Sequence, residues 1–141
     1  MKPRQSMPLT LPLSPSTGGE GMKEKSVVVL VTCPRTKFAE RLAHGLIQEN
    51  LAACVNLTAV RSVYRWKGKI EDDRETLLII KTTLQKFPLL RRYVVGRHPY
   101  KVPEIIALPI AQGHAPYLEW VCASVSNAEE RLLRRPPASS Q

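Results

Sequence analysis

The first apolar run along the chain covers residues 26 to 32 (SVVVLVT) and is short and mostly β-branched. Such a run predicts a central strand that is buried on both faces of a sheet. Apolar residues then recur at spacings of four, four and one, at Phe38, Leu42, Leu46 and Ile47. This spacing predicts a helix that starts after Pro34, ends near Asn50 and buries one face.

Two longer strand-like stretches follow, at residues 53 to 66 and 70 to 82, and Gly68 lies in the tight turn between them. They are expected to pair antiparallel as a hairpin. Helical spacing returns from Phe87 onward, and this second helix has to end before Pro99. Residues 103 to 110 predict a last strand and residues 117 to 125 a short closing helix.

This order of elements predicts an α+β, ferredoxin-like β-α-β-β-α-β sandwich with a short C-terminal helix. Right-handed crossovers give the strand order 4-1-3-2 and place both long helices on one face of the sheet. A sheet with its other face in water would carry polar residues at every second position of its strands. Residues 27–31, 77–80 and 105–108 do not show this alternation. A second copy of the same chain is therefore expected to cover that face.

The segments outside this unit differ in composition. Residues 1–25 are expected to form a disordered extension, since residues 1 to 21 are rich in Pro, Ser, Thr and Gly, with Met22 a second candidate start. Residues 126–141 are expected to form a flexible tail, which leaves residues 26–125 as the folded domain.

Composition and charge narrow the function classes. The net charge of +9 is spread along the chain without a nucleic-acid-binding motif, so no nucleic-acid partner is predicted. No apolar run is long enough to cross a membrane, no signal-peptide core is present, and the three cysteines lack metal-type spacing. A cytoplasmic protein is expected, and the absence of a nucleophile-and-base motif predicts no enzymatic activity.

Several segments together resemble the CutA family of divalent-ion tolerance proteins, over about residues 26 to 125. They are VTCP at 31–34, LAACVN at 51–56, SVYRWKGKIE at 62–71, IKTT at 80–83, HPYKVPEII at 98–106 and YLEW at 117–120. The resemblance implies a homotrimer with inward-facing sheets, a PII-like architecture and a role in tolerance to divalent metals, copper in particular. It implies no required cofactor, although copper or another divalent cation is a candidate ligand.

The predicted strand order brings the end of the first strand beside the start of the last, and so brings Cys33 near His98. A thiolate and an imidazole suit copper, and Glu104 is a conceivable third ligand. The favoured alternative is that Cys33 is a small residue at a strand end and that His98 ends the helix before Pro99. Some copper-binding members of the family carry Cys and His where this chain has Val31 and Arg97, and this departure weakens an inherited copper site.

The second candidate function is a PII-like sensor or signalling trimer, with a small molecule as ligand in a cleft between subunits. A metal ion or a small anion is a candidate partner, and a scaffolding trimer is a third candidate function. Tyr100, Lys101 and Glu104 are expected near the wall of that cleft. The other residues predicted for the cleft or the subunit interface are Tyr64, Trp66, Glu71, Lys81 and Trp120. Lys81 ends an apolar strand, so a buried ion pair between subunits with Glu71 or Glu104 is expected.

Overall fold

The computed structural model describes residues 25–126. The expected extension and tail, residues 1–25 and 126–141, lie almost wholly outside this range. The elements are β1 (Ser26–Cys33), α1 (Thr36–Gln48), β2 (Cys54–Trp66), β3 (Lys69–Thr83), α2 (Phe87–Arg97), β4 (Ile105–Pro109) and α3 (Ala115–Val125). This is the predicted order, with each boundary within about two residues of the prediction. No helix among the described residues has the length and apolar character needed to cross a membrane.

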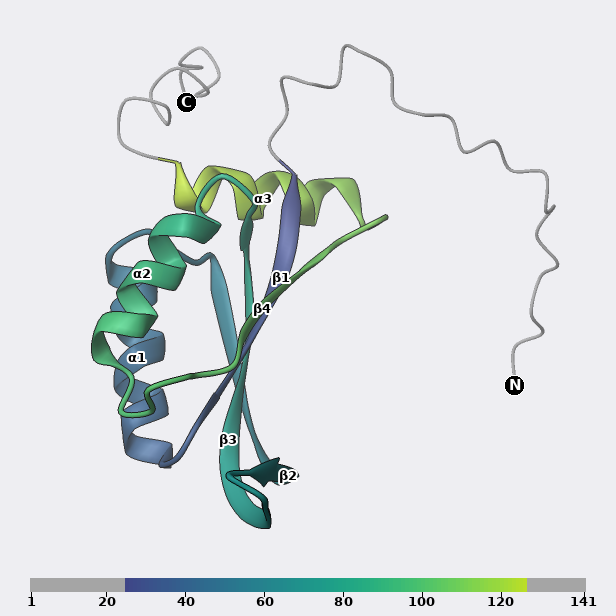
Figure 1. Cartoon of the computed structure of the whole chain (residues 1–141). Helices are drawn as coiled ribbons and strands as arrows, with labels where there is room; N and C mark the ends of the chain where they lie inside the picture. Colours follow the sequence, from purple (N-terminus) through teal and green to yellow (C-terminus); the bar gives the residue numbers. More distant parts are fainter. Residues whose placement is uncertain (1–24, 127–141) are drawn as a thin grey trace, which may run out of the picture.

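The four strands form one antiparallel sheet in the order β2-β3-β1-β4. β1 lies in the centre, where Val29 pairs with Ile80 of β3 on one side and with Ala107 of β4 on the other. Figure 1 shows α1 and α2 together on one side of the sheet. The α+β, ferredoxin-like sandwich expected from the sequence is confirmed, including its strand order.

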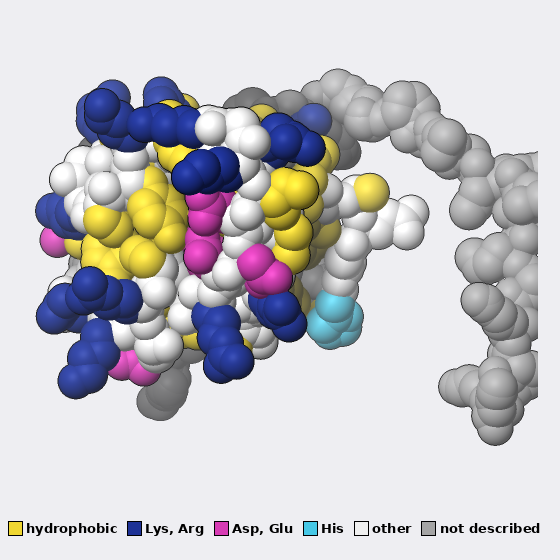
Figure 2. Space-filling view, turned by 60° about the horizontal axis from the view of Figure 1, so that its bottom comes forward, with side chains coloured by type: hydrophobic (Ala, Val, Ile, Leu, Met, Phe, Trp, Pro, Cys, Tyr) yellow, Lys and Arg dark blue, Asp and Glu magenta, His cyan; other side chains and the backbone are white. Residues whose placement is uncertain are grey.

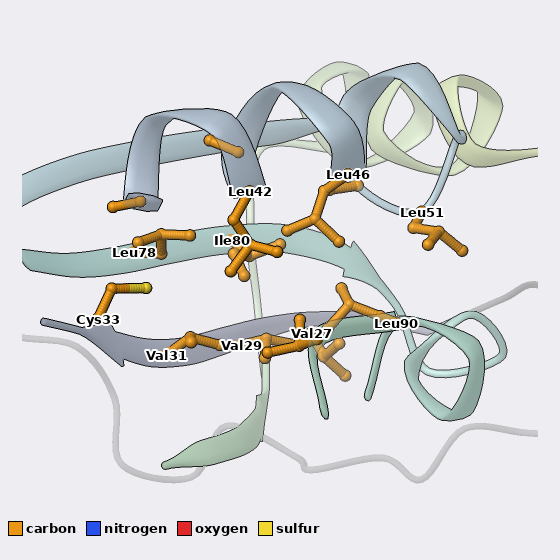
Figure 3. Close-up of a cluster of buried hydrophobic side chains, with 14 residues drawn as sticks. Val27, Val29, Val31, Cys33, Leu42, Leu46, Leu51, Leu78, Ile80 and Leu90 are labelled. Carbon is orange, nitrogen blue, oxygen red and sulfur yellow. The ribbon is translucent and has the colours of Figure 1, made fainter. Parts of the chain in front are cut away.

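The hydrophobic core lies between the sheet and these two helices. Figure 3 shows Leu42 and Leu46 of α1 pointing toward Leu78 and Ile80 of β3, and all four are at most 3% exposed. The helix spacing predicted these contacts at Leu42 and Leu46. It was wrong for Ile47, which is 42% exposed because it lies just past the buried stripe, on the solvent side of the helix.

The other face of the sheet, which we call the open face, is also apolar. On β1 and β3 the residues Val28, Leu30, Leu77 and Ile79 are only half-buried, and Ile106 and Leu108 of β4 are 45% and 46% exposed. The prediction that apolar residues occupy both faces is confirmed. Within one chain, however, β1 is fully buried only on the helix side, as the alternating burial along it shows.

The closing helix α3 covers one end of the sheet, which the sequence argument did not anticipate. It packs against β3 and β1, and its Val121 and Val125 are fully buried outside the main core. Tyr117 of α3 is hydrogen-bonded to Cys54, which pairs with Lys81 at that end of the sheet. Figure 1 shows α3 at the end of the sheet opposite the β2–β3 turn.

β2 and β3 extend beyond the rest of the sheet as a two-stranded hairpin, residues 60–75, which we call the hairpin arm. β1 pairs with β3 only from Thr76 to Thr83, so the arm has no third strand. Its two-residue turn is formed by Lys67 and Gly68, with φ of 51° and 81°. Positive φ at both positions is characteristic of a type I′ turn, which fits the twist of a hairpin.

Candidate functional site

A hollow of about 550 Å³ lies between the hairpin arm and the loop that joins α2 to β4. We call it the aromatic hollow. It is lined by Thr32, Ser62, Val63, Tyr64, Trp66, Glu75, Tyr100, Lys101, Val102 and Glu104. Five of these residues, Tyr64, Trp66, Tyr100, Lys101 and Glu104, are among those predicted for a ligand cleft or a subunit interface.

Glu75 is the most buried acidic residue of the hollow, with 7% of its surface exposed. The Tyr100 hydroxyl donates a hydrogen bond to Glu75 Oε2 at 2.9 Å. Burial and this hydrogen bond both raise the pKa of Tyr100. Within the described residues the only salt bridge joins Arg61 to Asp72, so the Glu75 carboxylate has no cationic partner there.

The second tyrosine of the hollow is also held by a carboxylate. Tyr64 donates a hydrogen bond from its hydroxyl to Asp73 Oδ2 at 2.6 Å, and this bond raises the pKa of Tyr64 to about 12. Glu71, Asp73 and Glu75 alternate along β3, which places their side chains on the same face of the strand. The hollow thus combines aromatic rings with negative charge.

His98, at the C-terminal end of α2, is buried at 8% exposure, and both of its ring nitrogens have hydrogen-bond partners. The backbone N–H of Tyr100 donates to His98 Nδ1 at 3.1 Å, so Nδ1 is the acceptor. The other nitrogen, Nε2, therefore carries the proton of the neutral ring and donates to the Thr32 carbonyl at 2.8 Å. This arrangement fixes one neutral tautomer of His98.

Thr32 connects His98 to Glu104. Its carbonyl oxygen accepts the bond from the imidazole, while its hydroxyl donates to Glu104 Oε1 at 3.3 Å. Val31 pairs with Ile105 directly beside this point, as expected for the end of the first strand next to the start of the last. The three residues predicted as metal ligands thus lie in one region of the fold.

The donor set at this position does not fit a metal ion. Cys33 is fully buried, and burial together with the charge of Glu75 raises the pKa of its thiol to about 12, so the thiolate that binds metals is disfavoured. The His98 lone pair on Nδ1 already accepts a hydrogen bond. Within residues 25–126, no group of three or more His, Cys, Asp or Glu side chains is arranged to hold a metal ion. Copper binding by Cys33, His98 and Glu104 stays a prediction that this geometry disfavours.

Three of the predicted interface residues lie away from the lining of the hollow. Lys81 Nζ donates to Asn56 Oδ1 and to the Ile79 carbonyl. Lys81 lies ten residues from Glu71 along β3, which is about 33 Å at the usual strand rise. Within one chain, Lys81 therefore cannot pair with Glu71. Trp120 of α3 is 47% exposed, and its ring lies 5.5 Å from that of Tyr117.

Sequence reasoning missed three polar residues of the hollow, Thr32, Ser62 and Glu75. Thr32 is the penultimate residue of an apolar strand and offers no distinctive signal. Glu75 had a signal, since it lies two residues before the apolar run from Leu77 to Ile80 and is the last acid of the alternating series on β3. A carboxylate at the edge of a buried strand segment is expected to have a specific hydrogen-bond donor.

The sequence of the chain is similar to that of known proteins over most of the described residues. A family model for the CutA1 divalent ion tolerance protein matches residues 27–124. Protein CutA from Homo sapiens is 47% identical over 131 residues, which cover 92% of this chain and 73% of that protein. Divalent-cation tolerance protein CutA from Thermus thermophilus is 50% identical over 95 residues, 67% of this chain and 92% of that protein.

The fold is shared with solved structures as well. The crystal structure of CutA1 from Oryza sativa superimposes with a TM-score of 0.71 at 46% identity, covering 74% of this chain and 97% of that one. The sequence match and the structural match both fall on the domain that carries the aromatic hollow. The chain belongs to the CutA1 divalent ion tolerance protein family.

Proposed function

We propose that the chain acts in divalent-cation tolerance as a homotrimer, whose subunits bury the open face of the sheet against one another. The observation that carries this proposal is the apolar character of that face. Ile106 and Leu108 remain nearly half exposed on it, and α3 covers only one end. A contiguous apolar surface of this kind is costly in water and is typical of an interface between subunits.

The charge of Glu75 gives independent support for a partner subunit. A buried carboxylate is normally paired with a cation or with several hydrogen-bond donors, and Glu75 receives one hydroxyl donor from Tyr100. The hairpin arm also carries two exposed apolar side chains, Val63 and Ile70, at 64% and 67% exposure, on the face of the arm opposite Glu75. A neighbouring chain that covers the arm would bury both.

Sedimentation equilibrium of the full chain tests the assembly. The expected mass is three times 15.8 kDa at micromolar concentration. Ile106→Asp places a charge on the open face and is expected to shift the mass toward the monomer. Leu89→Asp is the matched control, because Leu89 is 46% exposed on α2, on the other side of the sheet. A wild-type monomer, or equal dissociation by both variants, would contradict the proposal.

The tolerance role is tested in cells that lack their own gene for this protein. Growth in rising concentrations of copper or zinc is compared between cells expressing the wild type, Ile106→Asp and Leu89→Asp at equal protein levels. Wild type and the control variant are expected to protect the cells. Equal growth of cells with and without the protein would show that it has no such role.

A second candidate function is that of a small-molecule sensor, because one hollow is lined by five of the residues predicted for a ligand cleft. Its size is in the range of pockets that hold small organic ligands. A thermal-shift screen of metal ions, anions and nucleotides tests this function, since a ligand that binds the native state raises the melting temperature. Trp66→Ala is expected to abolish the shift, whereas Trp120→Ala, on α3 and outside the lining, is expected to preserve it.

We infer further that the chain is not an enzyme, needs no cofactor and acts in the cytoplasm. The inference that the chain is not an enzyme has chemical support, because His98 is held as a neutral hydrogen-bonding group and the buried Cys33 thiol is kept protonated. Neither group is set up as a base or nucleophile. Cell fractionation with an antibody to the protein tests the compartment, and recovery in a membrane or secreted fraction would contradict it.

A further inference from the structure

A second hollow of about 830 Å³ lies where the start of α1 meets the end of α2. We call it the basic hollow. It is lined by Pro34, Arg35, Thr36, Lys37, Phe38, Arg41, Arg97, Pro99 and Tyr100. Four of these nine residues are cationic and none is acidic.

The positive charge of the basic hollow is not neutralised within the described part of the chain. The only salt bridge there is between Arg61 and Asp72 on the hairpin arm. Tyr100 lines both hollows, but the carboxylates of Glu75 and Glu104 line the aromatic one alone. The first turn of α1 has no acidic residue and no side-chain cap, so its helix dipole adds to the positive potential.

One of the four cations is held in a defined orientation. The guanidinium carbon of Arg97 lies 3.6 Å from the centre of the Tyr93 ring, and Arg97 also donates a hydrogen bond to the Tyr93 carbonyl at 3.3 Å. A guanidinium stacked on an aromatic face can still offer its remaining edge donors, those not bonded to the Tyr93 carbonyl, to a planar or tetrahedral anion. Arg97 comes from α2 and Arg35, Lys37 and Arg41 from the start of α1, so the fold itself brings these charges together.

The rest of the lining, apart from Thr36, is aromatic or proline. Phe38 and Tyr100 are half-buried, and Pro34 and Pro99 complete this wall. The ring of Phe38 is braced by an edge contact with the His98 ring at 5.5 Å. A hollow that combines a cationic rim with aromatic and proline surfaces has a place for a flat ring as well as for charge.

We propose that the basic hollow binds a nucleoside polyphosphate, with its phosphates among Arg35, Lys37, Arg41 and Arg97 and its base against Phe38 and Tyr100. Four cations call for a ligand with several negative charges, and the volume of about 830 Å³ is much larger than a single phosphate group needs. Figure 2, which brings the lower end of the molecule forward, shows many Lys and Arg side chains there and few acidic ones.

The basic hollow is formed by one chain and lies at the ends of α1 and α2, on the helix side of the sheet. It therefore stays accessible when the open face is covered, and its ligand binding does not depend on the assembly proposed above. Sedimentation of each variant reports on that assembly separately, so failure of one proposal leaves the other intact.

Isothermal titration calorimetry of the full chain with ADP, pyrophosphate and adenosine tests the proposal. ADP is expected to bind at least tenfold more tightly than either part alone, and its affinity is expected to fall as salt rises. Pyrophosphate binding as tight as ADP would show that charge alone acts and would overturn the nucleotide assignment. Tighter binding of a single-stranded oligonucleotide than of ADP would overturn it in favour of a nucleic-acid surface.

Charge reversal locates the site. Arg41→Glu is expected to weaken ADP binding at least tenfold. The control Arg91→Glu makes the same charge change at an exposed position of α2 outside the lining, and is expected to change affinity less than twofold. Equal loss in both variants would indicate diffuse surface charge and overturn the site. Loss in Trp66→Ala without loss in Arg41→Glu would place ADP in the aromatic hollow instead.

Discussion

The hydroxyl of Tyr100 lies 2.9 Å from Glu75 Oε2 and donates a hydrogen bond to it. This contact joins the loop after α2 to the last residue of β3 before the central sheet begins. Tyr100 also donates its backbone N–H to His98, and it lines both the aromatic hollow and the basic hollow. Loss of its hydroxyl is expected to affect the whole region.

Tyr100→Phe is expected to destabilise the protein by about 1–3 kcal/mol, because the buried Glu75 carboxylate loses its hydroxyl donor. Urea unfolding followed by circular dichroism measures this change. Tyr64→Phe is the control, since the Tyr64 hydroxyl bonds the more accessible Asp73. A loss in Tyr64→Phe as large as in Tyr100→Phe would contradict the role given to burial of Glu75.

Alkaline pH is expected to destabilise the fold through Cys33. The pKa of its thiol is raised from 9.0 to about 12 in the folded state, so between these values the unfolded chain loses a proton that the native chain keeps. The native state then binds more protons, and the free energy of unfolding falls with rising pH, by up to about 1.4 kcal/mol per pH unit. Tyr100 contributes in the same direction, because its folded pKa is also raised.

Urea unfolding from pH 8 to 11 measures this slope. Cys33→Ala removes the thiol and is expected to be less stable at pH 8 because it leaves a cavity. The difference in the free energy of unfolding between this variant and the wild type is expected to shrink above pH 9, because the wild type then loses the stability that its protonated thiol contributes. A constant difference across this range would show that Cys33 does not carry the effect.

His98 is expected to stabilise the fold rather than to bind copper. His98→Ala leaves the Thr32 carbonyl and the Tyr100 N–H without their partner, at about 1–3 kcal/mol for each group that stays buried. Copper titration by calorimetry is expected to give the same affinity for wild type and variant. His98→Asn, which keeps a donor and an acceptor, is the second variant. A tenfold loss of copper affinity in both would establish the metal site that the geometry disfavours.

Gly45→Ala is expected to destabilise the packing of α1 against α2. A Cβ at this position would collide with the hydroxyl of Tyr93, whose ring also contacts Arg97. Overpacking of this kind costs about 1–3 kcal/mol, whereas the gain in helix propensity of Ala over Gly is only about 1 kcal/mol. Thermal unfolding measures the net loss, and Tyr93→Phe in the same chain is expected to restore most of it. No rescue by Tyr93→Phe would contradict the steric explanation.

The elements and their order were predictable from the sequence because the periodicity of apolar residues reports burial directly. The run at Val27 to Val31 identified the central strand, and Gly68 identified the hairpin turn. Both faces of the sheet were correctly expected to be apolar. The sequence did not reveal that α3 would cover one end of the open face, since the apolar residues of a short helix do not indicate which face they meet.

The candidate site was predictable only in part. The aromatic residues Tyr64, Trp66 and Tyr100, predicted for a ligand cleft or a subunit interface, line one hollow because a hairpin and a loop meet at one end of the sheet. Their role there stays a prediction. The partners of His98 were not predictable, because they are a backbone carbonyl and a backbone N–H, which leave no mark on composition or spacing. The basic hollow was not predicted for another reason. Arg35 and Arg97 are 62 positions apart in the sequence, and only the packing of α1 beside α2 brings them together.

Because the hairpin arm has only two strands, its order is expected to depend on the protein concentration. A hairpin without a third strand or a packed face is marginally stable in water, and β3 has no neighbour but β2 from Lys69 to Glu75. Deuterium uptake by amides in this stretch is therefore expected to slow as the solution is made more concentrated, while amides of β1 stay protected throughout. The hairpin arm would then become fully ordered only when the chain is assembled with other subunits.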